Sequence, residues 1–150
     1  MIDGLAAHLR EAHPSNMDTA TANSWLTEYF AEWVLALDPR VDALACTGAV
    51  LSIPVTEKVA RVGGFVSGQA LATLADTTMV IACAGHFRGF RPVATTNLDV
   101  QFLRPATGDR VSCTATIVRA GKSLIFARAT LIAEPSGKDV AAATATFAVP

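Results

Sequence analysis

The chain has 150 residues, of which 51% are hydrophobic and 17% are charged, and its formal net charge is -1. This length suits a single domain, and a chain this apolar lacks the low hydrophobicity and high charge of a disordered protein. A charge so close to zero argues against nucleic acid or an anionic membrane as the main partner. Because few polar side chains remain to cover the surface, we predict that part of the apolar surface is buried against another copy of the chain.

The cysteines, the N-terminus and the most apolar stretch exclude further classes of protein. The three cysteines are far apart and odd in number, which fits neither a disulfide framework nor a zinc ribbon. The histidines lack metal-ligand spacing, so no metal is expected. The N-terminus has neither the basic start nor the apolar run of a signal peptide, which favours a cytoplasmic protein. Residues 63–85 are apolar but are interrupted by polar residues, so they are not predicted to cross a membrane.

The first part of the chain predicts two helices. A short one is expected over residues 1–13. Apolar residues between 25 and 37 then recur at the spacing of an amphipathic helix. Asp18 or Thr19 is the expected N-cap of this second helix, and Asp38-Pro39 is expected to end it.

A strand and a buried helix are predicted next. Residues 49–59 alternate between apolar and polar as in a strand, in which Pro54 indicates an edge or a bulge. Residues 67 to about 85 are apolar nearly all round, which is typical of a buried helix, and Ser67 is its candidate N-cap.

After Pro92 the side chains are expected to alternate between two faces, residue by residue, as in a β-strand. One face is expected to carry Thr96, Leu98, Val100 and Phe102, and the other Thr95, Asn97, Asp99 and Gln101. Further strands are expected over about residues 111–119, 124–133 and 140–149, with hairpin turns between them. We therefore predict an α+β fold in which a long central helix is wrapped by a curved antiparallel sheet.

Asp76 is the only charged residue between Gly63 and Gly85, and the predicted helix places it among apolar neighbours. An unpaired carboxylate in such a setting costs several kcal/mol or takes a raised pKa. Carboxylates of this kind are often catalytic bases or nucleophiles. A structural alternative stays open, in which Asp76 is hydrogen-bonded to a neighbouring strand.

Gly68 lies at the start of the same helix, where free backbone N–H groups and the positive end of the dipole are presented. A glycine there lets a ligand carbonyl or oxyanion approach closely, or it serves turn geometry alone. Gly68 and Asp76 are eight residues apart, which is about 12 Å along a helix at ~1.5 Å per residue. A hydrogen bond spans only about 3 Å. If both groups act on one reacting centre, they must come from different chains, which is a second reason to predict a dimer.

Two segments carry a resemblance to a known family. VSGQALATLAD at residues 66–76 and NLDVQFLRP at 97–105 are similar to the hotdog-fold acyl-CoA thioesterases of the phenylacetate-degradation, or PaaI-like, type. The resemblance covers about residues 49–150. It implies one hotdog domain over 1–150, with a helical N-terminal extension over 1–38 and a core from about 45 to 150.

The resemblance also implies roles for single residues. In that family a helix Asp acts on the thioester as general base or nucleophile, a glycine N–H of the opposite subunit polarises the carbonyl, and a strand hydroxyl helps to hold the attacking water. The matching positions are Asp76, Gly68 and Thr95. The family usually has His-Gly-Gly where this chain has Ser67-Gly68-Gln69, so Ser67 is expected either to cap the helix alone or to contact substrate as well.

The substrate would carry coenzyme A, whose phosphates need cations, and no separate cofactor is expected. The expected substrate-binding residues are Ser67, Gln69, Asn97, Arg104, Arg119, Gly121 and Lys122.

The resemblance predicts hydrolysis of acyl- or aryl-CoA thioesters by a homodimer or a dimer of dimers. Two alternatives stay open. A hotdog hydratase or dehydratase generally pairs a His with a carboxylate, and no His lies on the buried helix interior or on the following strand. A non-catalytic acyl-CoA binding module is kept open by that missing His.

Overall fold

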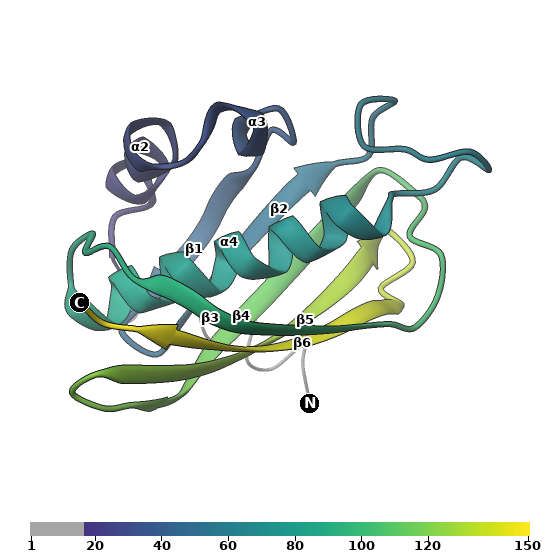
Figure 1. Cartoon of the computed structure of the whole chain (residues 1–150). Coiled ribbons are helices and arrows are strands. Elements are labelled where there is room, and N and C mark those ends of the chain that lie inside the picture. Colours follow the sequence, from purple (N-terminus) through teal and green to yellow (C-terminus); the bar gives the residue numbers. More distant parts are fainter. Residues whose placement is uncertain (1–16) are drawn as a thin grey trace.

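A six-stranded antiparallel sheet curves around one long helix, α4 (Gly68–Phe87), in the computed structural model of this chain (Figure 1). The structure describes residues 17–150, so the helix expected over residues 1–13 lies outside the described residues. The predicted α+β fold, a long helix wrapped by a curved antiparallel sheet, is confirmed.

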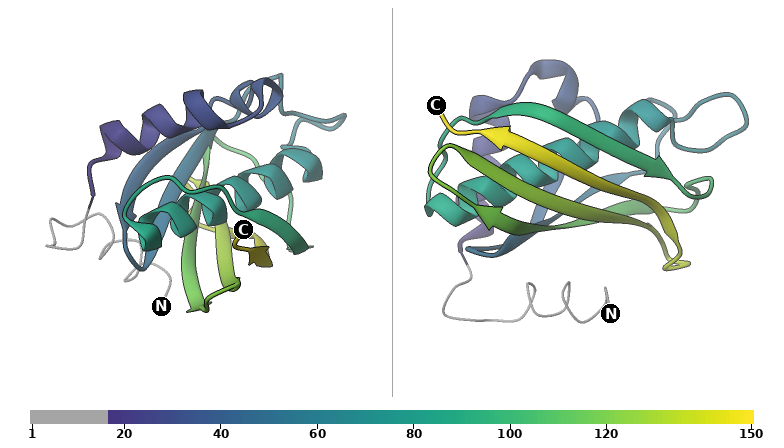
Figure 2. Two further views of the ribbon diagram at one scale, coloured as in Figure 1. Left: turned by 60° about the vertical axis from the view of Figure 1, so that its left-hand side comes forward. Right: turned by 60° about the horizontal axis from the view of Figure 1, so that its bottom comes forward.

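The order of the strands in the sheet differs from their order in the chain. The sheet runs β1-β2-β4-β5-β6-β3, and every neighbouring pair is antiparallel. The strands are β1 (Arg40–Ala45), β2 (Gly48–Pro54), β3 (Ala94–Phe102), β4 (Arg110–Ala120), β5 (Leu124–Glu134) and β6 (Asp139–Ala148). Strand β3 follows α4 in the chain, and among residues 17–150 it pairs with β6 alone, so it forms one edge of the described sheet (Figure 2).

Helix α4 is held by its caps and by its apolar surface. The Ser67 hydroxyl accepts a hydrogen bond from the Ala70 N–H, as expected of an N-cap, and the helix ends at Arg88 in the left-handed conformation. By length and composition α4 is apolar enough to cross a membrane, but 67% of that segment is buried inside the protein. The apolar surface of α4 therefore packs against the sheet and forms the core.

One side of α4 is not covered by the sheet. Gln69 is exposed, and Thr73, Asp76 and Val80 are partly exposed, at the three- and four-residue spacing of a single helix face. The expectation of a helix buried all round is therefore wrong along this stripe. The sheet is wide enough to cover only part of the circumference of α4.

The N-terminal helix is shorter than expected because the chain breaks at Phe30. Helix α2 (Thr19–Tyr29), capped by Asp18, is followed by the one-turn helix α3 (Glu32–Leu35) instead of continuing to residue 37. The Tyr29 ring stacks on Phe90 with centroids 4.0 Å apart, and Phe30 meets the same ring at 6.2 Å. Neighbouring side chains on a helix diverge by about 100°, so both can reach Phe90 only where the helix ends.

The first two strands correct the sequence prediction in two ways. Strand β1 was not predicted, and β2 ends at Pro54 instead of continuing to residue 59. Strand β2 is an interior strand between β1 and β4, but at Pro54 it pairs with β4 alone, so the edge expected at this residue is present locally. Pro54 is tolerated because pairing with β1 stops at Ser52, so no hydrogen bond to β1 is lost at the proline.

A bulge in β3 changes which of its side chains face α4. The register of β3 against β6 shifts between Thr95 and Asn97. Thr95 lies opposite the buried Phe147, and Phe102 lies opposite the buried Ala141. Since cross-strand partners share a face of the sheet, both Thr95 and Phe102 face α4. The alternation that put them on opposite faces is wrong because the bulge takes up one extra residue.

Close packing of α4 against β1 makes a glycine necessary at position 85. A Cβ added to Gly85 would lie 2.3 Å from the Ala45 carbonyl oxygen, whereas one added to Gly89 meets nothing within 4 Å. We expect Gly85→Ala to destabilise the fold by about 1–3 kcal/mol through overpacking, despite the better helix propensity of alanine. Thermal unfolding should show a lower Tm for this variant and an unchanged Tm for Gly89→Ala, and equal Tm values for the two variants would contradict this account.

Candidate active site

Asp76 lies in the middle of α4, on the stripe that the sheet leaves uncovered. Its Oδ1 accepts a hydrogen bond of 3.0 Å from the Thr95 hydroxyl on β3. Burial raises the pKa of the Asp76 carboxyl, and the Thr95 hydrogen bond acts in the opposite direction by favouring the charged form. Over residues 17–150 the one salt bridge joins Arg40 and Asp42, so no cation of this part of the chain neutralises Asp76.

The structure brings together Asp76 and Thr95, which the sequence placed in one site. The bulge in β3 turns the Thr95 side chain toward α4, where its hydroxyl donates directly to the carboxylate. No described residue donates a hydrogen bond to Oδ2, and the Asp76 side chain is partly exposed. Thr95 thus orients the Asp76 carboxylate through Oδ1, while Oδ2 makes no hydrogen bond to a described residue. A general base or a nucleophile needs one such oxygen to react with water or substrate.

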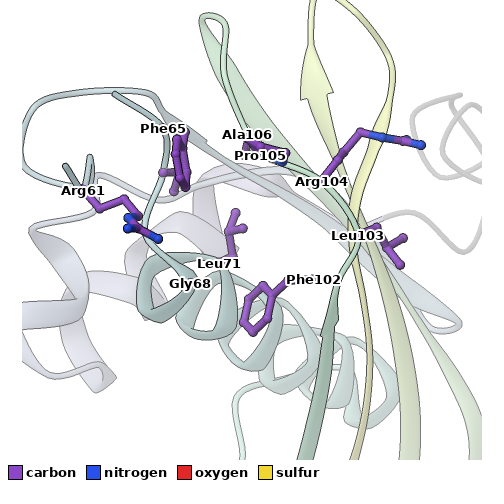
Figure 3. Close-up of a pocket in the computed structure, with 10 residues that line it drawn as sticks. Arg61, Phe65, Gly68, Leu71, Phe102, Leu103, Arg104, Pro105 and Ala106 are labelled. Atoms are coloured by element: carbon purple, nitrogen blue, oxygen red, sulfur yellow. The ribbon is translucent and has the colours of Figure 1, made fainter. Parts of the chain in front are cut away.

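A cavity of about 350 Å³ lies beside the N-terminus of α4 (Figure 3). Gly68 is the first residue of α4, so its N–H has no acceptor within the helix. The rings of Phe65 and Phe102 and the Leu71 side chain surround the cavity next to Gly68, and Arg61 lies at its rim. This end of the helix can therefore present a backbone donor to a ligand held among apolar side chains.

Gly68 and Asp76 contact opposite ends of β3. A Cβ at Gly68 would meet the ring of Phe102, near the end of the strand, at 3.3 Å. Asp76 is bonded to Thr95, near its beginning. One chain therefore does not bring the two groups to a single reacting centre, which agrees with the separation expected from their spacing.

The other predicted binding residues fall into three places. Ser67, Gln69 and Arg104 lie at the cavity end of the molecule. Ser67 caps α4 with its side chain, and Gln69 is exposed in the first turn of the helix. Arg104 lines the cavity, and its Nη1 donates a hydrogen bond of 2.7 Å to the Asp139 carbonyl. Asn97 is exposed on β3, where it lies opposite Thr146 on the sheet face turned away from α4.

The remaining three lie at the far end of the sheet, in and beside the β4–β5 hairpin. They are Arg119, Gly121 and Lys122, and all are exposed. The strand registers place this hairpin beside the C-terminal end of β6 and the start of β3, whereas Gly68 and Arg104 lie near the end of β3. A single chain does not bring these three residues to the cavity.

Sequence reasoning missed the aromatic walls of the cavity. Phe65 lies in the loop before α4, and Phe102 was assigned only to a face of a strand. The proximity of Phe102 to Gly68 depends on the pairing of β3 with β6 and on the bulge, so no local pattern shows it. The only signal was that Phe102 falls within the NLDVQFLRP segment.

Comparison with known proteins identifies relatives of this chain. The model of the thioesterase superfamily matches residues 63–140, just over half of the chain. No curated protein sequence matches it.

Solved structures extend the likeness to most of the chain. A thioesterase family protein from Silicibacter pomeroyi is 25% identical, with a TM-score of 0.75, over 85% of this chain and 94% of its own. A variant of the phenylacetic acid degradation protein PaaI from Thermus thermophilus is 26% identical, with a TM-score of 0.70, over 80% of this chain and 100% of its own. Thioesterase superfamily member 2 of zebra fish, at 23% identity, shares the fold with a TM-score of 0.76 over 88% of this chain and 95% of its own.

The burial of Asp76 predicts a pH-dependent cost to stability. Because the pKa of Asp76 is raised in the folded protein, the native state holds its proton more tightly than the unfolded chain, and stability falls as pH rises through the raised pKa. In Asp76→Asn the amide oxygen can still accept from Thr95, but no charge is buried. We expect Asp76→Asn to have a higher Tm than the wild type at about pH 8 and to lose this advantage toward about pH 4.

Asp99→Asn is the matched control, because Asp99 is exposed on the same strand as Thr95. Its Tm should follow that of the wild type at every pH. A constant difference between Asp76→Asn and the wild type from pH 4 to pH 8 would contradict the assignment of the cost to the Asp76 charge.

Proposed function

This chain belongs to the thioesterase superfamily, and on that basis we propose that it hydrolyses acyl- or aryl-CoA thioesters to the free acid and coenzyme A. The observation that carries the proposal is Asp76, a partly buried carboxylate with a raised pKa, held by Thr95 and unpaired with any cation of the described residues. Raising the pKa of a carboxylate makes it a stronger base, and functional sites often contain such carboxylates.

In the proposed reaction Asp76 acts through Oδ2, the oxygen that Thr95 leaves free. As general base, it takes a proton from water while the water oxygen attacks the thioester carbonyl carbon. The carbon–sulfur bond then breaks, and the leaving thiolate takes up the proton. As nucleophile, Oδ2 attacks the same carbon, the carbon–sulfur bond breaks and the coenzyme A thiolate leaves. Water then cleaves the resulting mixed anhydride, which releases the acid, returns Asp76 as a carboxylate and supplies the proton that the thiolate takes up. Both routes use the same position of Asp76.

The proposed oxyanion donor is the Gly68 N–H of a second subunit. Gly68, the first residue of α4, lines the cavity, and the positive end of the helix dipole would favour a developing negative charge there. Since Gly68 and Asp76 of one chain contact opposite ends of β3, the proposed site joins Asp76 of one subunit with Gly68 of the other.

The free edge of β3 supports a dimer of this kind. In the described part of the chain β3 pairs with β6 on one side and with no strand on the other, and eight of its nine residues are exposed in the single chain. An exposed edge strand is a ready template for pairing with another strand. Asp76, on the uncovered stripe of α4, is bonded to Thr95 of this edge strand, so we propose that a partner at this edge also lies beside the stripe.

Antiparallel pairing of two β3 strands would bring the far end of one subunit beside the cavity end of the other. The partner's β4–β5 hairpin, with Arg119 and Lys122, would then lie three to four strands from β3 of the first subunit, or roughly 14–19 Å at ~4.8 Å per strand. We propose that these cations bind the phosphates of coenzyme A, while Arg104 lies beside the cavity itself.

A thiol-release screen tests the function directly. Purified protein is offered short, long and aromatic acyl-CoAs, and released coenzyme A is measured with a thiol reagent. We expect release from at least one class and a drop in kcat/KM of about 100-fold or more for Asp76→Asn, the range for loss of a general base. Asp99→Asn should keep wild-type kcat/KM.

Three outcomes would contradict this assignment. Equal turnover by Asp76→Asn and the wild type would exclude the role of Asp76. Hydration of an enoyl-CoA without thiol release would indicate a hydratase, and tight binding of CoA esters without any turnover would indicate a binding module.

A mixed dimer tests whether the site is shared between subunits. Asp76→Asn and Gly68→Val are each expected to be inactive, the second because a valine side chain, with its Cβ 3.3 Å from the Phe102 ring, fills the space through which a thioester carbonyl would approach the Gly68 N–H. When both are co-expressed, half of the dimers pair one variant with the other, and each of these has one intact site. The mixture should therefore reach about one quarter of wild-type activity. A mixture as inactive as its components would place both groups in the site of one chain.

A further inference from the structure

The cavity beside Gly68 has walls suited to an acyl group. Within about 350 Å³, Phe65, Leu71 and Phe102 surround its centre. The polar side chains that line it are Arg61 and Arg104. Arg61 lies over the Phe65 ring at 4.8 Å, and Arg104 points away from the centre to the Asp139 carbonyl (Figure 3).

An apolar acyl group suits this lining better than the pantetheine arm of coenzyme A. The arm carries amide groups that lose hydrogen bonds to water when they are buried, and each loss costs free energy unless a partner is supplied. Phe65, Leu71 and Phe102 supply no such partner. Apolar acyl carbons, by contrast, are stabilised when such side chains remove them from water.

Phe102 is the wall closest to the proposed reacting carbonyl. Its ring lies 3.3–3.8 Å from the position of a Cβ at Gly68, so the space between the ring and the helix end admits a glycine without strain. The same ring is 55% exposed in the single chain, and its other side faces the cavity. Phe102 lies on the inner face of β3, the face that also carries Leu98 four residues earlier in the strand.

We propose that Phe102 determines which acyl groups the enzyme accepts. This inference rests on the proposed thioester hydrolysis. At ~30 Å³ per non-hydrogen atom, taken from the volume of a water molecule in the liquid, the cavity of about 350 Å³ has room for an acyl group of roughly twelve such atoms. The structure therefore assigns short and medium acyl thioesters as substrates, and the phenyl ring of Phe102 blocks extension of longer chains along β3 toward Leu98.

The test compares chain-length profiles of Phe102 variants. Straight-chain acyl-CoAs from two to sixteen carbons are assayed by thiol release, and kcat/KM for each is divided by that for the best short substrate. Wild-type kcat/KM should fall beyond about ten carbons. Phe102→Ala should raise the relative kcat/KM for longer chains at least tenfold, Phe102→Leu should give a smaller shift, and Phe102→Trp should shorten the accepted range.

Phe126→Ala is the matched control. Phe126 is a phenylalanine of similar exposure, 40%, and it lies opposite Thr146 on the sheet face turned away from α4. Its profile should match that of the wild type.

The outcomes separate this inference from the function on which it rests. If the wild type and Phe126→Ala are active but the Phe102 variants keep the wild-type profile, Phe102 does not determine specificity, while thioester hydrolysis stands. If the wild type releases no thiol from any substrate, the proposed function fails and this inference fails with it. If Phe102→Ala does not fold, Phe102→Leu and Phe102→Trp provide the test, because the first should accept longer acyl chains than the wild type and the second shorter ones. Identical chain-length profiles for these two variants would overturn the inference.

Discussion

The packing of α4 against the inner face of the sheet is the interaction on which the rest of the structure depends. Nearly all of the large buried side chains, from Leu74 and Met79 on the helix to Leu131 and Phe147 on the strands, belong to this one core. The contact is close enough that Gly85 lies against the backbone of Ala45. Because the helix is fixed along its length, its N-terminus and its uncovered stripe are fixed as well, and these two features carry the candidate site.

Asp76 lies at the boundary between this core and the surface. Burial alone would favour its neutral form, and exposure alone would leave its pKa at the ordinary value. Its position on the uncovered stripe gives partial burial, and the Thr95 hydroxyl stabilises the charged form in part. The carboxylate therefore carries a cost in stability that the fold tolerates in return for a stronger base, a common relation between stability and activity at functional sites.

The two ends of β3 connect the core to the proposed dimer. Thr95 near one end orients the carboxylate, and Phe102 at the other end packs over Gly68. The strand itself has a free edge. In the proposed dimer, one strand thus positions the base, shapes the acyl cavity and pairs with the partner that completes the site. These three roles restrict the sequence and the geometry of β3 at the same time. The bulge between Thr95 and Asn97 fits this restriction, because a bulge redirects the Thr95 side chain toward α4 while the rest of the strand keeps its pairing with β6.

The sequence by itself determined the elements whose signal is local. The buried helix, its Ser67 cap and the four strands after it follow from the spacing of apolar residues, and Asp76 stood out as one charge in an apolar stretch. Tertiary structure alone decided strand β1, the end of α2 at Phe30, the edge position of β3 and the approach of Phe102 to Gly68. Local periodicity reports which face of an element is apolar. It does not report which strand pairs with which, or where a bulge shifts the register, because these depend on contacts between residues far apart in the chain.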